Sequence, residues 1–219
     1  MGQYYKPYIR DKEGSAKSFN PQNAIYKTVR GLSGDDEAGY RSEGYYDHFS
    51  GMKLMEHSWM DNDFVNGVLE CLHDSPHAVA WVGDYADESD DFRGAYTTGV
   101  YNAAWGDDSL PEGPFGKMPA IHREGFVVNR SKGVYIDLAE YVKAATYSPK
   151  WARGHEWCIH PLPLLTAIGN GRGGGDYHGE HMEMVGAWAM DEIEYTQDAA
   201  KLDGLERVDV SGICFREAS

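Results

Sequence analysis

Apolar residues recur along this chain at spacings that predict both helices and strands. Those at positions 64, 65, 68, 69 and 72 fall on one helical face, which indicates an amphipathic helix. We expect that helix to begin at Asp61 or Asn62 and to end before Ser75-Pro76. A second, shorter helix is expected over residues 138–145, where Ser148-Pro149 follows.

Short apolar or alternating runs predict the strands. The expected strands cover residues 3–9, 51–59, 78–82, 126–129, 134–138, 162–168, 184–190, 193–196 and 208–215. The clearest hairpin turns at Arg130-Ser131-Lys132-Gly133. Because strands outnumber helices and short turns join them, we expect an α+β fold, with a largely antiparallel sheet and one or two packed helices.

The chain is expected to form a single domain over residues 1–219, with long loops at about 11–50 and 89–123. Two segments resemble each other, Ala80-Trp81-Val82-Gly83-Asp84 and Ala187-Trp188-Ala189-Met190-Asp191. They indicate either an internal pseudo-duplication or a chance match of short segments. A duplication predicts that Asp84 and Asp191 lie at equivalent strand ends.

Composition restricts the classes of partner. The net charge of −15 argues against binding to a nucleic-acid backbone or to an anionic membrane surface. No apolar run approaches the roughly 18 residues of a membrane span. Three widely spaced cysteines indicate reduced thiols and a cytoplasmic protein. A homo-oligomer is compatible with this composition.

The richest candidate for chemistry is the loop from Gly169 to Gly175, in which five of the seven residues are glycine. Successive backbone N–H groups in such a turn form a concavity suited to an anion, and Arg172 adds a planar fork of donors. The spacing matches neither the G-x-G-x-x-G fingerprint nor a P-loop. A flexible hairpin connection is the structural alternative.

Aromatic side chains accompany this loop, and their flat rings suit a nucleobase. We expect Tyr177 or Trp59 to stack on the base. No catalytic residue is assigned. The residues expected to bind a ligand are Gly169, Asn170, Gly171, Arg172, Gly173, Gly174, Gly175, Asp176, Tyr177, Trp59, Asp84 and Tyr85.

Histidines offer a different chemistry. His155, His160, His178 and His181 lie among carboxylates and are candidate ligands of a divalent metal. The pair His178 and His181 does not form H-E-x-x-H, and no helix is expected there. Exposed histidines on a polar loop are the alternative, so a metal cofactor is expected only if the protein is a hydrolase.

Four segments, Met1-Gly-Gln-Tyr-Tyr-Lys6, Lys53-Leu-Met-Glu-His-Ser-Trp59, Trp81-Val-Gly-Asp-Tyr-Ala86 and Gly169-Asn-Gly-Arg-Gly-Gly-Gly-Asp-Tyr177, are distinctive. Together they resemble an uncharacterised family of small phage and bacterial proteins. The resemblance implies one domain and a cytosolic setting, the host cytoplasm if the protein is phage-encoded. It implies no activity and no catalytic residue.

These features favour a non-enzymatic protein that binds a small anionic, nucleotide-derived ligand. In a phage, such a protein would sequester a host immune signal. Two alternatives remain open at this point: a metal-dependent hydrolase of a similar ligand, and an acidic protein-interaction module.

Overall fold

One mixed sheet organises the part of the protein that the structure, a computed structural model, describes: residues 2–10, 18–19, 53–60, 62–86, 122–147 and 156–213. Within these residues the sheet has eight strands in the order β2-β1-β3-β7-β4-β5-β8, with β6 beside β3. Almost all of the two predicted long loops lies outside the described residues. The strands are β1 (Tyr5–Arg10), β2 (Ser18–Phe19), β3 (His77–Gly83), β4 (Phe126–Asn129), β5 (Val134–Asp137), β6 (Ala167–Ile168), β7 (Glu192–Thr196) and β8 (Glu206–Arg207).

The α+β class is confirmed, and the sheet is only partly antiparallel. Most neighbouring strands run antiparallel, whereas β3 with β6 and β5 with β8 are parallel pairs. The predicted hairpin around Gly133 is formed by β4 and β5, and Gly133 has the positive φ of 68° that its turn requires. The helices are α4 (Leu54–His57), α5 (Asp63–Cys71), α7 (Leu138–Ala145) and α8 (Pro161–Leu165), with short 3₁₀ helices η2 (Met182–Met184), η3 (Ala199–Leu202) and η4 (Ser211–Ile213).

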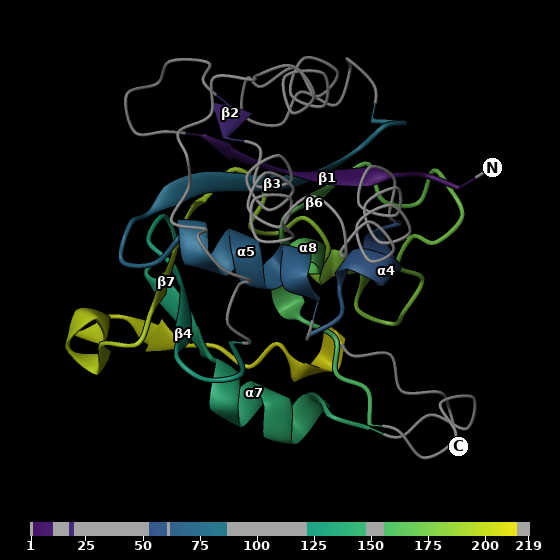
Figure 1. The fold of residues 1–219 in the computed structure, drawn as a ribbon. Helices are drawn as coiled ribbons and strands as arrows, with labels where there is room; N and C mark the ends of the chain where they lie inside the picture. Colours follow the sequence, from purple (N-terminus) through teal and green to yellow (C-terminus); the bar gives the residue numbers. More distant parts are fainter. Residues whose placement is uncertain are drawn as a thin grey trace, which may run out of the picture.

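The larger core lies on the side of β3 that faces the helices. Val79 and Trp81 of β3 are fully buried there. They belong to one cluster with Val68 of α5, Leu72 just after α5, and Leu164 of α8, which are also fully buried. Figure 1 shows α4, α5 and α8 together below β1 and β3. The alternate residues of β3, Ala80 and Val82, belong to a smaller cluster that includes Tyr8 and Ile168. The strand is therefore buried on both faces, which explains its continuous apolar sequence.

The segment predicted as a strand at 51–59 is helical in its described part. The backbone N–H of Lys53 donates to Glu56 Oε2 at 2.9 Å, and Ser58 Oγ donates to the carbonyl oxygen of Leu54 at 2.8 Å. These side chains satisfy groups at the two ends of the short helix α4. Local capping thus overrides the alternating pattern, and the strand prediction is wrong there.

The apolar run 162–168 is also mostly helical, as α8, and only Ala167–Ile168 form a strand. His160 caps the helix, since its Nδ1 accepts a hydrogen bond from the backbone N–H of Leu162 at 3.1 Å. Pro161 occupies the first helical position, where its missing N–H costs nothing. A continuous apolar run does not distinguish a buried helix from a strand.

The two segments that suggested an internal duplication do not have the same structure. Residues 80–83 belong to β3, whereas residues 187–190 lie in turns, where Met190 has a φ of 61°. Asp84 follows the end of β3, whereas Asp191 precedes β7, so the two carboxylates are not at equivalent positions. The strands predicted at 184–190 and 208–215 are wrong as well: the first is replaced by η2 and turns, and the described part of the second includes η4.

Candidate functional site

The glycine loop is closed at its neck by one side chain. The amide of Asn170 accepts from the backbone N–H of Tyr177 at 2.8 Å and donates to the carbonyl oxygen of the same residue at 3.1 Å. These two bonds tie the start of the loop to its end, as a pair of strand residues would. The loop therefore has a defined shape rather than that of a loose connection.

Asp176 occupies the interior of the loop. Its Oδ2 atom accepts hydrogen bonds from three backbone N–H groups, those of Gly171 at 2.7 Å, Arg172 at 2.9 Å and Gly173 at 3.0 Å. The side chain is buried, and its Oδ1 atom has no hydrogen-bond partner in the described structure. The N–H groups of the turn thus converge on a negative charge, and that charge is a carboxylate of the chain itself rather than a bound ligand.

The loop is docked on the N-terminal segment and on α4. Gly2 and Gly174 form a bridge, and the backbone N–H of Gln3 donates to the carbonyl oxygen of Gly174 at 3.3 Å. The N–H of Met55 donates to Gly175 at 3.1 Å. With the Gln3 amide oriented so that its nitrogen faces acceptors, that nitrogen donates to Asp176 Oδ2 at 3.1 Å and to the carbonyl oxygen of Gly169 at 2.9 Å. The N-terminal segment and α4 therefore both contact the end of the loop, at Gly174 to Asp176.

Two of the glycines have clear physical reasons. Gly175 has a φ of +85°, and a Cβ there would lie 2.2 Å from Cδ of Lys53. A Cβ on Gly173 would lie 2.5 Å from the backbone nitrogen of Gln3. The close approach of the loop to the N-terminal segment thus requires the absence of side chains.

Arg172 joins the loop to the end of β3. Its Nη1 donates to the carbonyl oxygen of Tyr85 at 3.1 Å, and the residue is exposed. Asp84 Oδ1 accepts from the backbone N–H of Tyr4 at 3.0 Å, while the N–H of Asp84 donates to the carbonyl oxygen of Tyr4 at 2.9 Å. The structure therefore places Tyr85 next to the loop and ties Asp84 to the N-terminal segment on which the loop docks.

Two titratable side chains on β1 are perturbed next to this region. Burial raises the pKa of the Tyr5 hydroxyl, and the neighbouring Asp176 carboxylate raises it further. Burial lowers the pKa of Lys6 to about 7, against a smaller opposing effect of Asp84. The proton on Lys6 is therefore held weakly at neutral pH.

The two aromatic residues expected to stack on a base lie elsewhere. Tyr177 is 1% exposed and belongs to the hydrophobic core, so its ring faces protein rather than solvent. Trp59 is 41% exposed, pairs with Ile159 and stacks on Trp157 with ring centroids 5.5 Å apart. Tyr85 is half-buried and contacts Arg172 through its backbone carbonyl oxygen.

The four candidate metal ligands are not brought together in the described residues. His160 is fully buried as the cap of α8, and burial lowers its pKa to about 3, so the ring is neutral. His181 pairs with Glu183 at 2.9 Å, and His178 is exposed. His155 lies outside the described residues. Within those residues, no group of three or more His, Cys, Asp or Glu side chains is arranged to hold a metal ion.

One polar cluster was missed by the sequence analysis. His122 Nε2 lies 3.1 Å from Glu70 Oε1, and the backbone N–H of His122 donates to Asn66 Oδ1 at 2.9 Å. Asn66 and Glu70 are four residues apart on α5, so their spacing already placed two polar groups on one face of that helix. No spacing in the sequence indicates the partner, because His122 comes from a segment distant in the chain.

Comparisons with protein-family models, curated proteins and solved structures found no match. The resemblance to phage and bacterial proteins therefore stays a prediction. Among the described residues, no helix has the length and apolar character needed to cross a membrane.

Proposed function

We propose that the protein binds a small anionic, nucleotide-derived ligand at the surface formed by Arg172, Asp84 and Tyr85. The observation that carries this proposal is the bond from the Arg172 guanidinium to Tyr85, which places an exposed cation over the end of β3. Arginine presents a planar set of donors that matches a phosphate. The chain has a net charge of −15, and Arg172 is a cation that shares its surroundings with the carboxylates of Asp84 and Asp176, which act with it on Tyr5.

The ligand's phosphate would meet Arg172 rather than the loop backbone. Because Gly171, Arg172 and Gly173 already donate their N–H groups to Asp176, a phosphate there would have to displace a buried carboxylate. The Asp176 bonds instead fix the backbone from which Arg172 projects. A preorganised cation loses less conformational entropy on binding than one on a mobile loop.

The remaining contacts suit the other parts of a nucleotide. The carboxylate of Asp84 repels phosphate. A carboxylate in such a place accepts hydrogen bonds from ribose hydroxyls or from the amino groups of a base. Tyr85 is half-buried, and a base bound beside Arg172 would stack on its ring. If the protein is phage-encoded, binding without turnover would sequester a host signal.

The proposal is tested by a thermal-shift screen of mononucleotides, dinucleotides and cyclic dinucleotides. Saturation at about 100 times the Kd stabilises a protein by about 2.7 kcal/mol, or about 5–10 °C at this chain length. The ligand recovered by chromatography should be intact. An absence of any shift across the panel would contradict binding, and it would favour the acidic interaction module, which a screen for protein partners then tests.

A second candidate, a hydrolase of a similar ligand, is favoured by the His122–Glu70 pair. A carboxylate 3.1 Å from an imidazole nitrogen orients the ring as a general base requires. This candidate predicts that the recovered nucleotide is cleaved, and that Glu70→Gln slows cleavage without weakening the thermal shift. Intact ligand after prolonged incubation rejects it.

A further inference from the structure

A small pocket lies on the opposite part of the sheet from the glycine loop, between α7, β5 and the segment that follows β8. Its volume is about 190 Å³. The chain path explains its walls: β8 pairs in parallel with β5, and the N–H of Val208 donates to the carbonyl oxygen of Tyr135 at 2.9 Å. Residues 207–210 therefore run past the exposed side of α7, and a gap is left between them.

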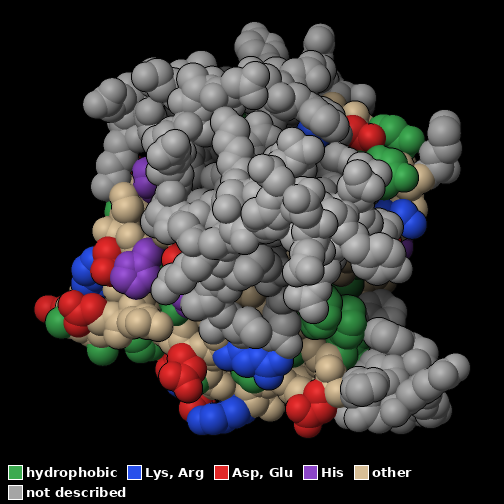
Figure 2. Space-filling model, viewed as in Figure 1, with side chains coloured by type: hydrophobic (Ala, Val, Ile, Leu, Met, Phe, Trp, Pro, Cys, Tyr) green, Lys and Arg blue, Asp and Glu red, His purple; other side chains and the backbone are tan. Residues whose placement is uncertain are grey.

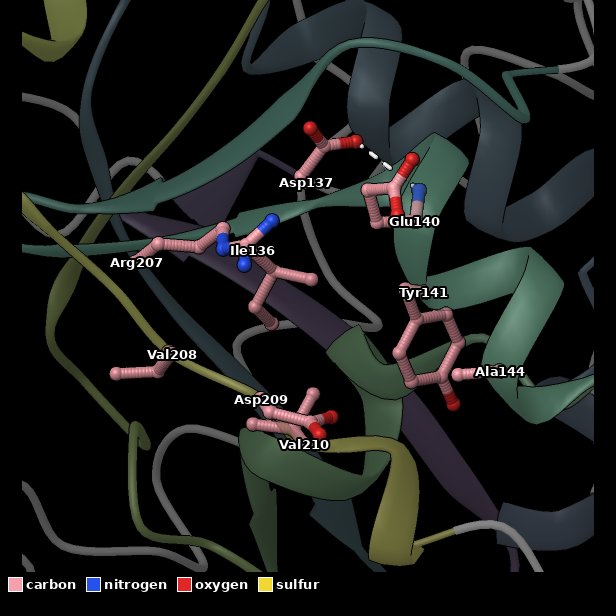
Figure 3. Close-up of a pocket in the computed structure, with 9 residues that line it drawn as sticks. All are labelled: Ile136, Asp137, Glu140, Tyr141, Ala144, Arg207, Val208, Asp209 and Val210. Atoms are coloured by element: carbon pink, nitrogen blue, oxygen red, sulfur yellow. Dashed lines mark hydrogen bonds between the residues drawn. The ribbon is translucent and has the colours of Figure 1, made fainter.

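The floor of this pocket is apolar. Ile136, Tyr141 and Val210 are 1%, 3% and 6% exposed, and all three line it. The Tyr141 hydroxyl donates to the carbonyl oxygen of Ile159 at 2.7 Å, so its polar end is already satisfied and the ring faces the pocket. Figure 3 shows this ring across the pocket from Ile136.

The mouth of the pocket carries charges of both signs. Figure 3 shows Arg207 and Glu140 on opposite sides, with Asp209 beside Val210 on a third. A hydrogen bond from Lys143 lowers the pKa of Glu140, and the backbone of Ser211 lowers that of Asp209; Arg207 contributes to both shifts. Both carboxylates are therefore charged at neutral pH. Figure 2 shows acidic and basic side chains interspersed on the surface around α7.

We propose that this pocket binds a free α-amino acid with an apolar side chain. Arg207 takes the carboxylate, Glu140 and Asp209 take the ammonium group, and the side chain lies on Ile136, Tyr141 and Val210. The acidic groups beside Arg207 exclude a phosphate by repulsion. A zwitterion carries both signs of charge and can pair with Arg207 and with the carboxylates at once. An apolar side chain on that ligand would cover the apolar floor of the pocket.

The ligand chemistry has two possible sources, a free amino acid and the end of a peptide. A peptide's first residue has an ammonium group but no free carboxylate, and its last residue has the reverse. Leucinamide and N-acetylleucine carry these two halves separately. Binding of L-leucine that exceeds the binding of both analogues therefore assigns the site to the free zwitterion.

The test is a titration of the full chain with L-leucine, leucinamide and N-acetylleucine, followed by nuclear magnetic resonance or calorimetry. We expect leucine to bind about tenfold more tightly than either analogue, since each lost charge pair costs about 1.4 kcal/mol. Arg207→Ala should lower leucine affinity to that of leucinamide, and Arg207→Lys should restore part of it. Glu140→Gln should weaken leucine and leucinamide but not N-acetylleucine.

Glu206→Gln is the matched control, because Glu206 is exposed on β8 next to Arg207 and does not line the pocket. It should leave leucine binding unchanged. No saturable leucine binding, equal binding of leucine and either analogue, or an unchanged affinity in Arg207→Ala would each overturn the proposal. Circular dichroism of each variant verifies that the fold is retained.

Discussion

The Oδ2 atom of Asp176 lies 2.7 Å from the backbone nitrogen of Gly171, inside the turn whose glycines suggest a phosphate site. The turn is suited to an anion, and a side chain of the same loop supplies it. This internal contact fixes the loop without any ligand. Arg172 projects from the same turn and donates to the carbonyl oxygen of Tyr85. We propose that it is the group that meets an external anion.

Removing the Asp176 carboxylate should destabilise the protein. In Asp176→Ala three backbone donors lose their acceptor, and we expect a loss of about 2–3 kcal/mol in the free energy of unfolding. Asp176→Asn keeps one acceptor oxygen but loses the charge, so about 1 kcal/mol is expected. Urea unfolding measures both. A loss no larger than that of Asp203→Asn, an exposed aspartate, would show that the bonds contribute nothing.

Two glycine substitutions separate backbone strain from steric contact. Gly171 has a φ of +93° and open space around it, so Gly171→Ala should cost only the strain of a left-handed residue, about 1–2 kcal/mol. Gly173→Ala places a Cβ 2.5 Å from the backbone nitrogen of Gln3 and should cost more, because the N-terminal segment must move. Hydrogen exchange should accelerate at Gln3 in the second variant alone. Equal effects in both variants would contradict the docking of residues 2 and 3 on the loop.

Lys6 makes stability depend on pH. Its folded pKa of about 7 lies below the ordinary value of 10.5, so between these values the unfolded state binds more protons and stability rises with pH. The contribution is up to about 1.4 kcal/mol per pH unit. Lys6→Met should therefore be more stable than the wild type at pH 6, and the difference should shrink as pH increases from 7 toward 10. If the stability difference between Lys6→Met and the wild type does not change with pH, the pKa of Lys6 is not lowered in the folded protein.

Glu194 of β7 should contribute strongly to the stability of the protein. Its side chain is 4% exposed and accepts from Arg130 Nε at 2.7 Å and from Lys201 Nζ at 3.1 Å. Glu194→Ala leaves two cations without this partner, and we expect a loss of about 2–3 kcal/mol. Glu192→Ala, on an exposed position of the same strand, is the control and should change stability by less than about 0.5 kcal/mol.

The parts of the fold that follow a simple periodicity could be predicted from the sequence. Helix α5 has a complete apolar face, and the β4–β5 hairpin has a clear turn at Gly133. The predictions of secondary structure are wrong where one short polar contact decides the conformation. The bond from Leu162 to His160 Nδ1 starts a helix in a run that otherwise suits a strand, and no periodicity contains that information.

The candidate site shows a similar division. The loop glycines and Arg172 predict an anion-binding turn, and Asp84 and Tyr85 are expected to share a site with it. That Asp176 itself fills the turn depends on how the chain folds back through Asn170, which sequence spacing does not show. Tyr177 was assigned a role at the surface because it follows a polar loop, yet its ring completes the core.

The most direct test of the account compares nucleotide binding in wild type, Arg172→Ala, Arg172→Lys and Lys143→Ala by thermal shift across the same nucleotide panel. Lys143 is an exposed cation on α7, so Lys143→Ala is the control for a loss of one positive charge. We predict that Arg172→Ala abolishes the shift, that Arg172→Lys keeps a salt-sensitive fraction of it, and that Lys143→Ala matches the wild type. A shift of full size in Arg172→Ala would contradict the assignment of Arg172 as the anion-binding group.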